Sequence, residues 1–200
     1  MKLEQLRGKL FYQTLLLGGF SLLGSAFLSF GDVKTHDAIA QRVAEDLKAS
    51  LEQVIPADYY DNDLLKDTLL INSETLVYLA KKEGKVNAVA FMLTTPTGYS
   101  GEIRSIIGID KAGQVLGVRV IAHAETPGLG DKIEASKADW ILKFNGHSLK
   151  DLTQTQWKVK KDGGVFDQFS GATITPRAVV GSVYQGLEFF EQHRETLLTP

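Results

Sequence analysis

The distribution of apolar and polar positions separates an apolar N-terminal stretch from a longer region of mixed patterning. From Leu10 to Phe30 the sequence contains no charged residue. Because an α-helix rises about 1.5 Å per residue, a stretch of this length can cross the hydrocarbon core of a bilayer, which is about 30 Å thick. The pattern therefore predicts a transmembrane helix over residues 10–30. The alternative is a cleaved signal peptide, for which the small residues at 24–26 would provide a processing site.

The charges before the apolar stretch predict its orientation. Residues 1–9 contain three basic side chains and one acidic side chain. Because basic residues are found preferentially on the cytoplasmic side of a membrane, we expect residues 1–9 to form a cytoplasmic N-terminus. The chain after Phe30 would then lie on the opposite side of the membrane.

Beyond the apolar stretch, the sequence first has helical periodicity. Apolar side chains recur at intervals of three or four residues, at Ile39, Val43, Leu47, Leu51 and Val54. Proline does not continue a helix, so the periodic segment should stop near Pro56. We interpret residues 31–66 as a stalk and packing helix.

The middle of the chain changes to the pattern of β-strands. Five segments rich in β-branched and apolar residues are separated by turns that contain glycine. These segments are Thr68–Ile71, Thr75–Ala80, Val86–Thr95, Glu102–Asp110 and Val115–His123. Because the links between them are short, successive strands should pair in a largely antiparallel sheet. With flanking helices, this sheet predicts an α+β domain over residues 67–200.

Further elements follow the predicted strands. Apolar spacing indicates a helical segment over Asp131–Phe144, and a short strand is expected at Trp157–Lys160. A last helix should have Thr175 as its N-cap, Pro176 in its first turn, and an end near Arg194.

Composition narrows the classes of function. The net charge is -2, and such a balanced charge argues against a nucleic-acid-binding surface. The chain has no cysteine, which excludes disulfides, thiolate metal sites and cysteine-linked flavin. His123 and Glu125 could offer two metal ligands from one strand, but two are too few for a metal site. Any redox role must use a cofactor that is held in another way.

One small-residue segment lies directly before the last predicted helix. It reads Ser170, Gly171, Ala172 and Thr173. The free amides and the positive dipole end of a helix N-terminus favour a phosphate, and Gly171 and Ala172 leave room for it near the backbone. The alternative is that these residues only form a turn and a cap.

A second segment connects the fifth predicted strand to the next helical segment. It reads Glu125, Thr126, Pro127, Gly128, Leu129 and Gly130. The proline restricts the residue before it to extended conformations, and the glycines allow a flat or large ligand to approach the backbone. The alternative is a stiff connection without a ligand.

These two segments, together with a Gly-Tyr-Ser-Gly turn at 98–101, resemble the FMN-binding domain family. In that family the last threonine of S-G-A-T carries FMN through a phosphoester bond, and Thr173 is the matching position. E-T-P-G-L-G lies against the flavin in the family. The turn resembles a Gly-Tyr-Gly-Gly motif in which Ser100 replaces a glycine.

The resemblance extends over nearly the whole chain. A short N-terminus, one membrane helix, a sheet domain and the two motifs, in this order, resemble the G subunit of the Rnf electron-transport complex. This complex is an ion-translocating oxidoreductase, called the SoxR-reducing complex in some bacteria. The alternatives are the C subunit of sodium-pumping NADH:quinone reductase and, from another class, a membrane-anchored structural or binding module without flavin.

The resemblance implies a set of cofactor-binding residues, with no catalytic and no metal-binding residue. Thr173 would carry covalent FMN. The other implied flavin-binding residues are Ser170, Gly171, Ala172, Thr175, Glu125, Thr126, Pro127, Gly128, Leu129, Gly130 and Tyr99.

The resemblance also implies a function and a location. The chain would be an electron-carrying subunit of a translocase, not catalytic alone, that relays electrons through FMN while the complex moves Na⁺ or H⁺. It would span the bacterial inner membrane once and place its main domain in the periplasm. Its partners would be membrane and iron-sulfur subunits, and a flavin transferase during maturation.

Overall fold

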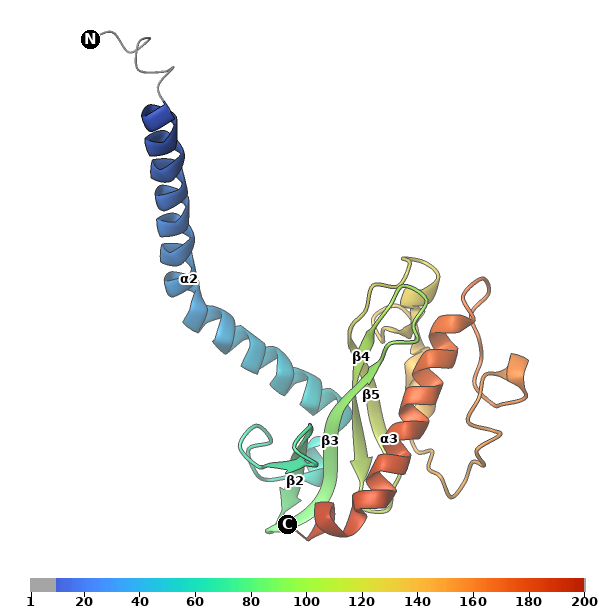
Figure 1. Ribbon diagram of the computed structural model, residues 1–200. Coiled ribbons are helices and arrows are strands. Elements are labelled where there is room, and N and C mark those ends of the chain that lie inside the picture. The colour runs from blue at the N-terminus through green and yellow to red at the C-terminus, as the bar shows by residue number, and fades with distance from the viewer. Residues whose placement is uncertain (1–9, 200) are drawn as a thin grey trace. The chain divides into compact units, whose positions relative to one another are not determined.

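The computed structural model describes residues 10–199, so the expected cytoplasmic segment at 1–9 lies outside the described residues. Two long helices, α2 (Leu10–Val54) and α3 (Ile174–Leu198), accompany a five-stranded sheet (Figure 1). The strands are β1 (Thr68–Ile71), β2 (Thr75–Lys82), β3 (Lys85–Thr95), β4 (Ile103–Asp110) and β5 (Val115–Ala122). Short 3-10 helices are η1 (Ala57–Tyr59), η2 (Gly130–Ile133), η3 (Asp139–Phe144) and η4 (Lys160–Asp162).

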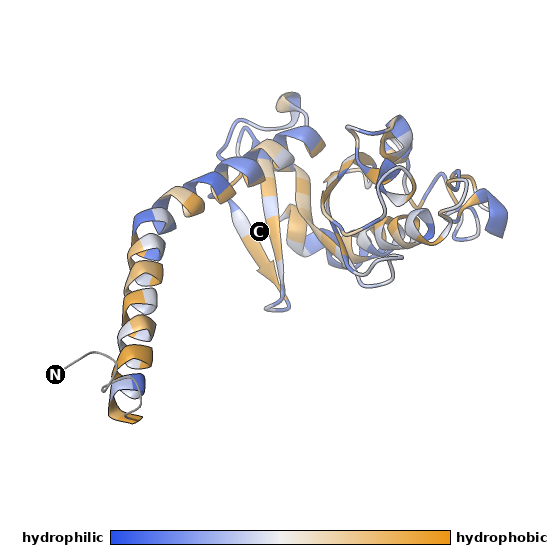
Figure 2. Ribbon diagram, turned by 90° about the horizontal axis from the view of Figure 1, so that it is seen from above, coloured by the Kyte–Doolittle hydropathy of each residue, from blue (hydrophilic) through white to orange (hydrophobic). Residues whose placement is uncertain are grey.

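Helix α2 contains both the apolar stretch and the amphipathic stripe, which form one helix. One compact unit of the chain ends at Asp46, and the second begins at Leu47. Hydrophobic residues dominate the first part of α2 (Figure 2). Phe11 and Phe27, for example, are 78% and 75% exposed. Such exposure is unfavourable in water but suits contact with lipid, and α2 is long and apolar enough to cross a membrane.

The five strands form an antiparallel meander in the order β1-β2-β3-β4-β5. The observed strand bounds lie within two residues of the predicted ones, and the predicted α+β fold is confirmed. Sequential hairpins explain the topology, because a short link can join antiparallel neighbours but not parallel ones.

Both faces of the sheet are apolar. Side chains alternate along each strand, so Val77, Phe91 and Ile107 share one face with α3 and the segments after β5. The opposite face packs against the end of α2, where Leu51 and Val54 are fully buried.

Small residues make room for the end of α2. Ala90, Gly108 and Gly117 are register partners in three adjacent strands. A Cβ at Gly108 would lie 2.2 Å from the Val54 carbonyl oxygen, and one at Gly117 would lie 2.9 Å from the Val54 Cα. The helix backbone therefore approaches the sheet more closely than larger side chains would allow.

The region between β5 and α3 differs from the sequence prediction. The single helical segment expected over Asp131–Phe144 is divided into η2 and η3, with Ala138 extended before η3. The strand expected at Trp157–Lys160 is also wrong, since Val159 forms only an isolated bridge with Phe166. Aromatic packing shapes this region instead: the rings of Trp140, Phe144, Trp157, Phe166 and Phe169 form a continuous series of contacts.

The close approach of α2 to the sheet gives a stability prediction. Gly108→Ala should lower the free energy of unfolding by about 1–3 kcal/mol, because the added methyl group overpacks the contact with Val54. Gly181→Ala is the matched control, since Gly181 is an internal residue of α3 and a Cβ added there would meet no atom within 4 Å beyond its chain neighbours and the adjacent helix backbone. It should be neutral or stabilising by about 1 kcal/mol. Urea unfolding of the full chain in detergent measures both; equal effects would contradict the proposed crowding.

Candidate functional site

Three segments that are distant in sequence meet at one end of the sheet. In the meander, β3 ends where β4 begins, at the Thr95 and Ile103 pair. Strand β5 ends at the same end of the sheet, where Ala122 pairs with Arg104. The chain topology therefore brings the β3–β4 turn and the loop after β5 together, and the first turn of α3 joins them.

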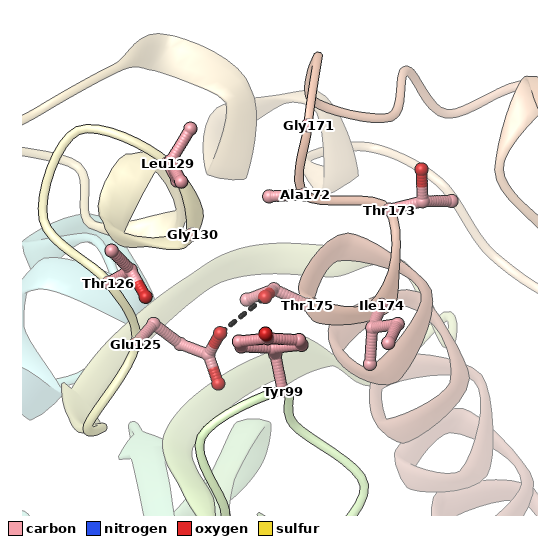
Figure 3. A pocket seen from close by; sticks show the side chains of 10 residues that line it. All are labelled: Tyr99, Glu125, Thr126, Leu129, Gly130, Gly171, Ala172, Thr173, Ile174 and Thr175. Atoms are coloured by element: carbon pink, nitrogen blue, oxygen red, sulfur yellow. Dashed lines mark hydrogen bonds between the residues drawn. The ribbon is translucent and has the colours of Figure 1, made fainter.

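These segments surround an open pocket with a volume of about 210 Å³ (Figure 3). Its lining residues are Tyr99, Glu125, Thr126, Leu129, Gly130, Gly171, Ala172, Thr173, Ile174 and Thr175. Tyr99, Leu129 and Ile174 are large and at least 42% exposed, whereas Glu125 and Thr175 are buried. The pocket thus combines exposed apolar side chains with buried polar ones, as small-molecule sites do.

Glu125 connects the three segments. Its Oε1 accepts a hydrogen bond from the Ser100 amide at 3.0 Å, and its Oε2 accepts one from the Thr175 hydroxyl at 2.5 Å. The residue is only 5% exposed. Buried polar atoms need partners, and these two bonds supply one for each carboxylate oxygen.

His123 closes the base of the loop that follows β5. Its Nδ1 accepts the Glu125 amide hydrogen at 3.0 Å, so the proton of the neutral ring lies on Nε2. Nε2 then donates to Glu134 Oε1 at 2.9 Å. The hydrogen bond from His123 holds the pKa of the Glu134 carboxyl below its usual value. His123 is therefore tied to the loop, and the described residues contain no cluster suited to a metal ion.

The start of α3 corrects one expectation. The helix begins at Ile174, and the residue before it is Thr173, whose side chain makes no capping hydrogen bond. The prediction of Thr175 as the N-cap is wrong, because the buried Glu125 carboxylate accepts its hydroxyl instead. The first amides of a helix have no partner within the helix and, with the helix dipole, favour an anion.

The segment before α3 is held by charged groups. Asp167 forms ion pairs with Lys143 and, at 2.5 Å, with Lys160, and the Trp140 indole donates to the Asp167 carbonyl at 2.7 Å. Hydrogen bonds from these lysines hold the pKa of the Asp167 carboxyl below its usual value. These contacts anchor the chain three residues before Ser170.

Most of the expected site residues lie together. All lining residues except Ile174 are among those expected from the sequence, whereas Ser170, Pro127 and Gly128 do not line the pocket. Ile174 follows Thr173 and is 45% exposed. An apolar residue before the polar Thr175 gives no sequence signal of its own, since exposure at a helix start depends on the fold.

The residues present fit a flavin nucleotide. The apolar side chains suit an isoalloxazine ring, and the free amides at the start of α3 suit a phosphate. Small-molecule pockets are commonly about 300–1,000 Å³, so a flavin nucleotide would extend beyond this smaller pocket into solvent or toward a partner.

Comparison with known proteins agrees with this geometry. Residues 98–188 match the family model of the FMN-binding domain. The G subunit of the ion-translocating oxidoreductase complex from Cereibacter sphaeroides is 53% identical over 190 residues, covering 93% of this chain and 86% of the relative. The G subunit of the same complex from Vibrio cholerae is 44% identical, with 92% and 91% coverage.

One solved structure aligns with part of the chain. The C subunit of the Na⁺-translocating NADH-quinone reductase from Parabacteroides distasonis aligns with a TM-score of 0.48 and 22% sequence identity. The alignment covers 66% of this chain and 68% of that one.

The fold and the pocket thus define an FMN-binding domain joined to an apolar helix. The chain belongs to the family formed by the G subunits of ion-translocating oxidoreductase complexes. The family resemblance inferred from the sequence motifs is confirmed.

The buried hydrogen bond between Thr175 and Glu125 gives a second stability prediction. Thr175→Val keeps the side-chain shape but leaves Glu125 Oε2 without its donor, so it should lower the free energy of unfolding by about 1–3 kcal/mol. Thr175→Ser retains the hydroxyl and should lose less. Urea unfolding followed by tryptophan fluorescence compares the variants. An equal or larger loss in Thr175→Ser would contradict a dominant contribution from the hydrogen bond, because serine retains the hydroxyl and valine does not.

Proposed function

We propose that this chain is a membrane-anchored flavoprotein subunit that relays electrons through FMN bound covalently to Thr173. The observation that carries the proposal is the position of Thr173, which lines the pocket directly before the N-terminus of α3. When bound, FMN supplies the redox chemistry, and the polypeptide binds and orients it. The chain serves a larger oxidoreductase complex and is not catalytic alone.

The two threonines at the pocket differ in availability. Thr173 is half-buried and its hydroxyl caps no helix, whereas Thr175 is fully buried and its hydroxyl is held by Glu125. Their side chains point in different directions in Figure 3. A flavin transferase needs access to the hydroxyl that it modifies, which favours Thr173 as the acceptor.

Other residues at the pocket support the same cofactor. The amides that follow Thr173 would hold the phosphate, and the apolar side chains of Tyr99, Leu129 and Ile174 would contact the flavin ring. Gly128 has a φ of +79°, a conformation that favours glycine, so it shapes the loop without lining the pocket.

The charges before the apolar helix support the proposed orientation, and the bacterial relatives support a location in a bacterial membrane. Residues 10–30 anchor the chain, residues 1–9 lie in the cytoplasm, and the FMN-binding domain lies in the periplasm of a bacterium. The partners are membrane and iron-sulfur subunits of the ion-translocating complex. A flavin transferase completes maturation.

Covalent attachment is tested by mass. Protein produced with a flavin transferase should be heavier than the apoprotein by one FMN less one water, and Thr173→Ala should abolish this increment because it removes the acceptor hydroxyl. Thr175→Ala is the matched control and should retain some of the increment. Intact-mass spectrometry, together with flavin fluorescence of the denatured protein, reports the bond. An undiminished increment in Thr173→Ala would refute the assignment.

Topology is tested with reporters at the C-terminus. We expect a full-chain fusion to alkaline phosphatase to be active, because this enzyme matures outside the cytoplasm, and a fusion to a fluorescent protein that matures only in the cytoplasm to be dark. The same reporters at the N-terminus are the control and should give the opposite pattern. A bright C-terminal fluorescent fusion would show that the C-terminus lies in the cytoplasm and would contradict the proposed orientation.

A further inference from the structure

A buried carboxylate at the pocket has no counter-charge. Glu125 is 5% exposed, and both of its carboxylate oxygens accept hydrogen bonds from neutral groups, the Ser100 amide and the Thr175 hydroxyl. Within residues 10–199, no lysine, arginine or histidine side chain forms an ion pair with it. Buried charges are normally paired, so an unpaired one at a ligand pocket calls for a functional explanation.

The neighbouring imidazole of His123 does not pair with this carboxylate. His123 contacts the Glu125 backbone amide through Nδ1, which must be unprotonated to accept that hydrogen. Its Nε2 faces Glu134 and not Glu125. The contacts of His123 therefore go to the Glu125 backbone and to Glu134, and neither of them reaches the Glu125 carboxylate.

The backbone closes around the carboxylate at two glycines. A Cβ at Gly98 would lie 2.3 Å from the Gly101 carbonyl oxygen and 2.8 Å from Glu125 Oε1, and one at Gly130 would lie 2.7 Å from Glu125 Oε2. A side chain at either position would crowd the carboxylate where it now lies. Gly98 lies in the β3–β4 turn and Gly130 begins η2, so the carboxylate is closely packed by both segments that form the pocket with α3.

We propose that Glu125 is a positioning residue that lowers the midpoint potential of FMN bound in this pocket. Its carboxylate holds the Ser100 turn and the first turn of α3 together, and it places an uncompensated negative charge in the wall of the flavin pocket. The inference rests on the proposed function, because it requires FMN in the pocket.

The charge has a defined effect on reduction. A flavin bound there would gain negative charge at its ring with each electron that it accepts without a proton, and a fixed negative charge nearby in a medium of low dielectric would oppose this step. The oxidised flavin is favoured as a result, and the midpoint potential is lowered. Removing the charge should favour one-electron reduction by about tenfold, which corresponds to a rise of about 59 mV.

Glu125→Gln tests the charge and Glu125→Asp is its matched control. Glutamine keeps the length and an acceptor oxygen but removes the charge, whereas aspartate keeps the charge and shortens the reach. In dithionite titrations of the flavinylated full chain in detergent, Glu125→Gln should raise the potential clearly more than Glu125→Asp. An unchanged potential in Glu125→Gln, or equal rises in both variants, would overturn the proposal, since a purely structural role affects both.

A measurement on the unaltered protein applies even where a variant fails to fold. Glutamate labelled with carbon-13 at its side-chain carboxyl enters every glutamate of the chain, but Glu125 is the one glutamate among the described pocket-lining residues and is the one expected to respond to the flavin. Flavin reduction should perturb an ionised carboxylate band in the infrared difference spectrum. A spectrum without a labelled band, or with the band of a protonated acid, contradicts the proposal.

The two proposals fail in distinguishable ways. Intact mass is measured first, and an unaltered chain without the FMN increment would refute covalent attachment and, with it, the role of Glu125. A chain with the increment whose potential is insensitive to Glu125→Gln refutes the role of Glu125 alone.

Discussion

A sheet with two apolar faces must be covered on both, and this constraint organises the second compact unit. One face carries Val77, Phe91 and Ile107 and is covered by α3 and the aromatic segments. The other face is covered by the end of α2, which approaches the backbone at Gly108 and Gly117. Removing either cover would expose fully buried side chains to water, at a cost of about 25 cal/mol per Å² of apolar surface.

The same arrangement produces the pocket. Because the sheet is a meander, the β3–β4 turn and the end of β5 lie at the same end of the sheet. Helix α3 covers one face of the sheet and begins at this end, so its first backbone amides lie near the two loops. The Glu125 carboxylate then joins the three segments with two hydrogen bonds. The lining residues, which are spread between positions 99 and 175, are thus brought together by the order of the strands and not by proximity in the sequence.

The sequence was informative where local patterning determines the structure. Runs of β-branched and apolar residues between glycine turns define the five strands, because each strand has side chains that must be buried on both faces. The same reasoning failed over Asp131–Phe144, where burial of Trp140 and Phe144 in the aromatic series divides the helical segment. It also failed at Thr175, because the partner that captures its hydroxyl lies 50 residues away in the chain. Long-range partners of this kind leave no local signal.

A covalent link changes what the pocket has to provide. A freely exchanging ligand needs enough contact to offset its loss of translational and rotational freedom, and the volume of about 210 Å³ is small for a flavin nucleotide. In the proposed attachment at Thr173, rebinding of the ring becomes intramolecular, at an effective concentration in the millimolar range or above. A few contacts would then be sufficient to seat the ring, and part of the ring would remain open to an electron donor or acceptor. The exposed apolar side chains of Tyr99, Leu129 and Ile174 are consistent with this division: they can contact a tethered ring without enclosing it.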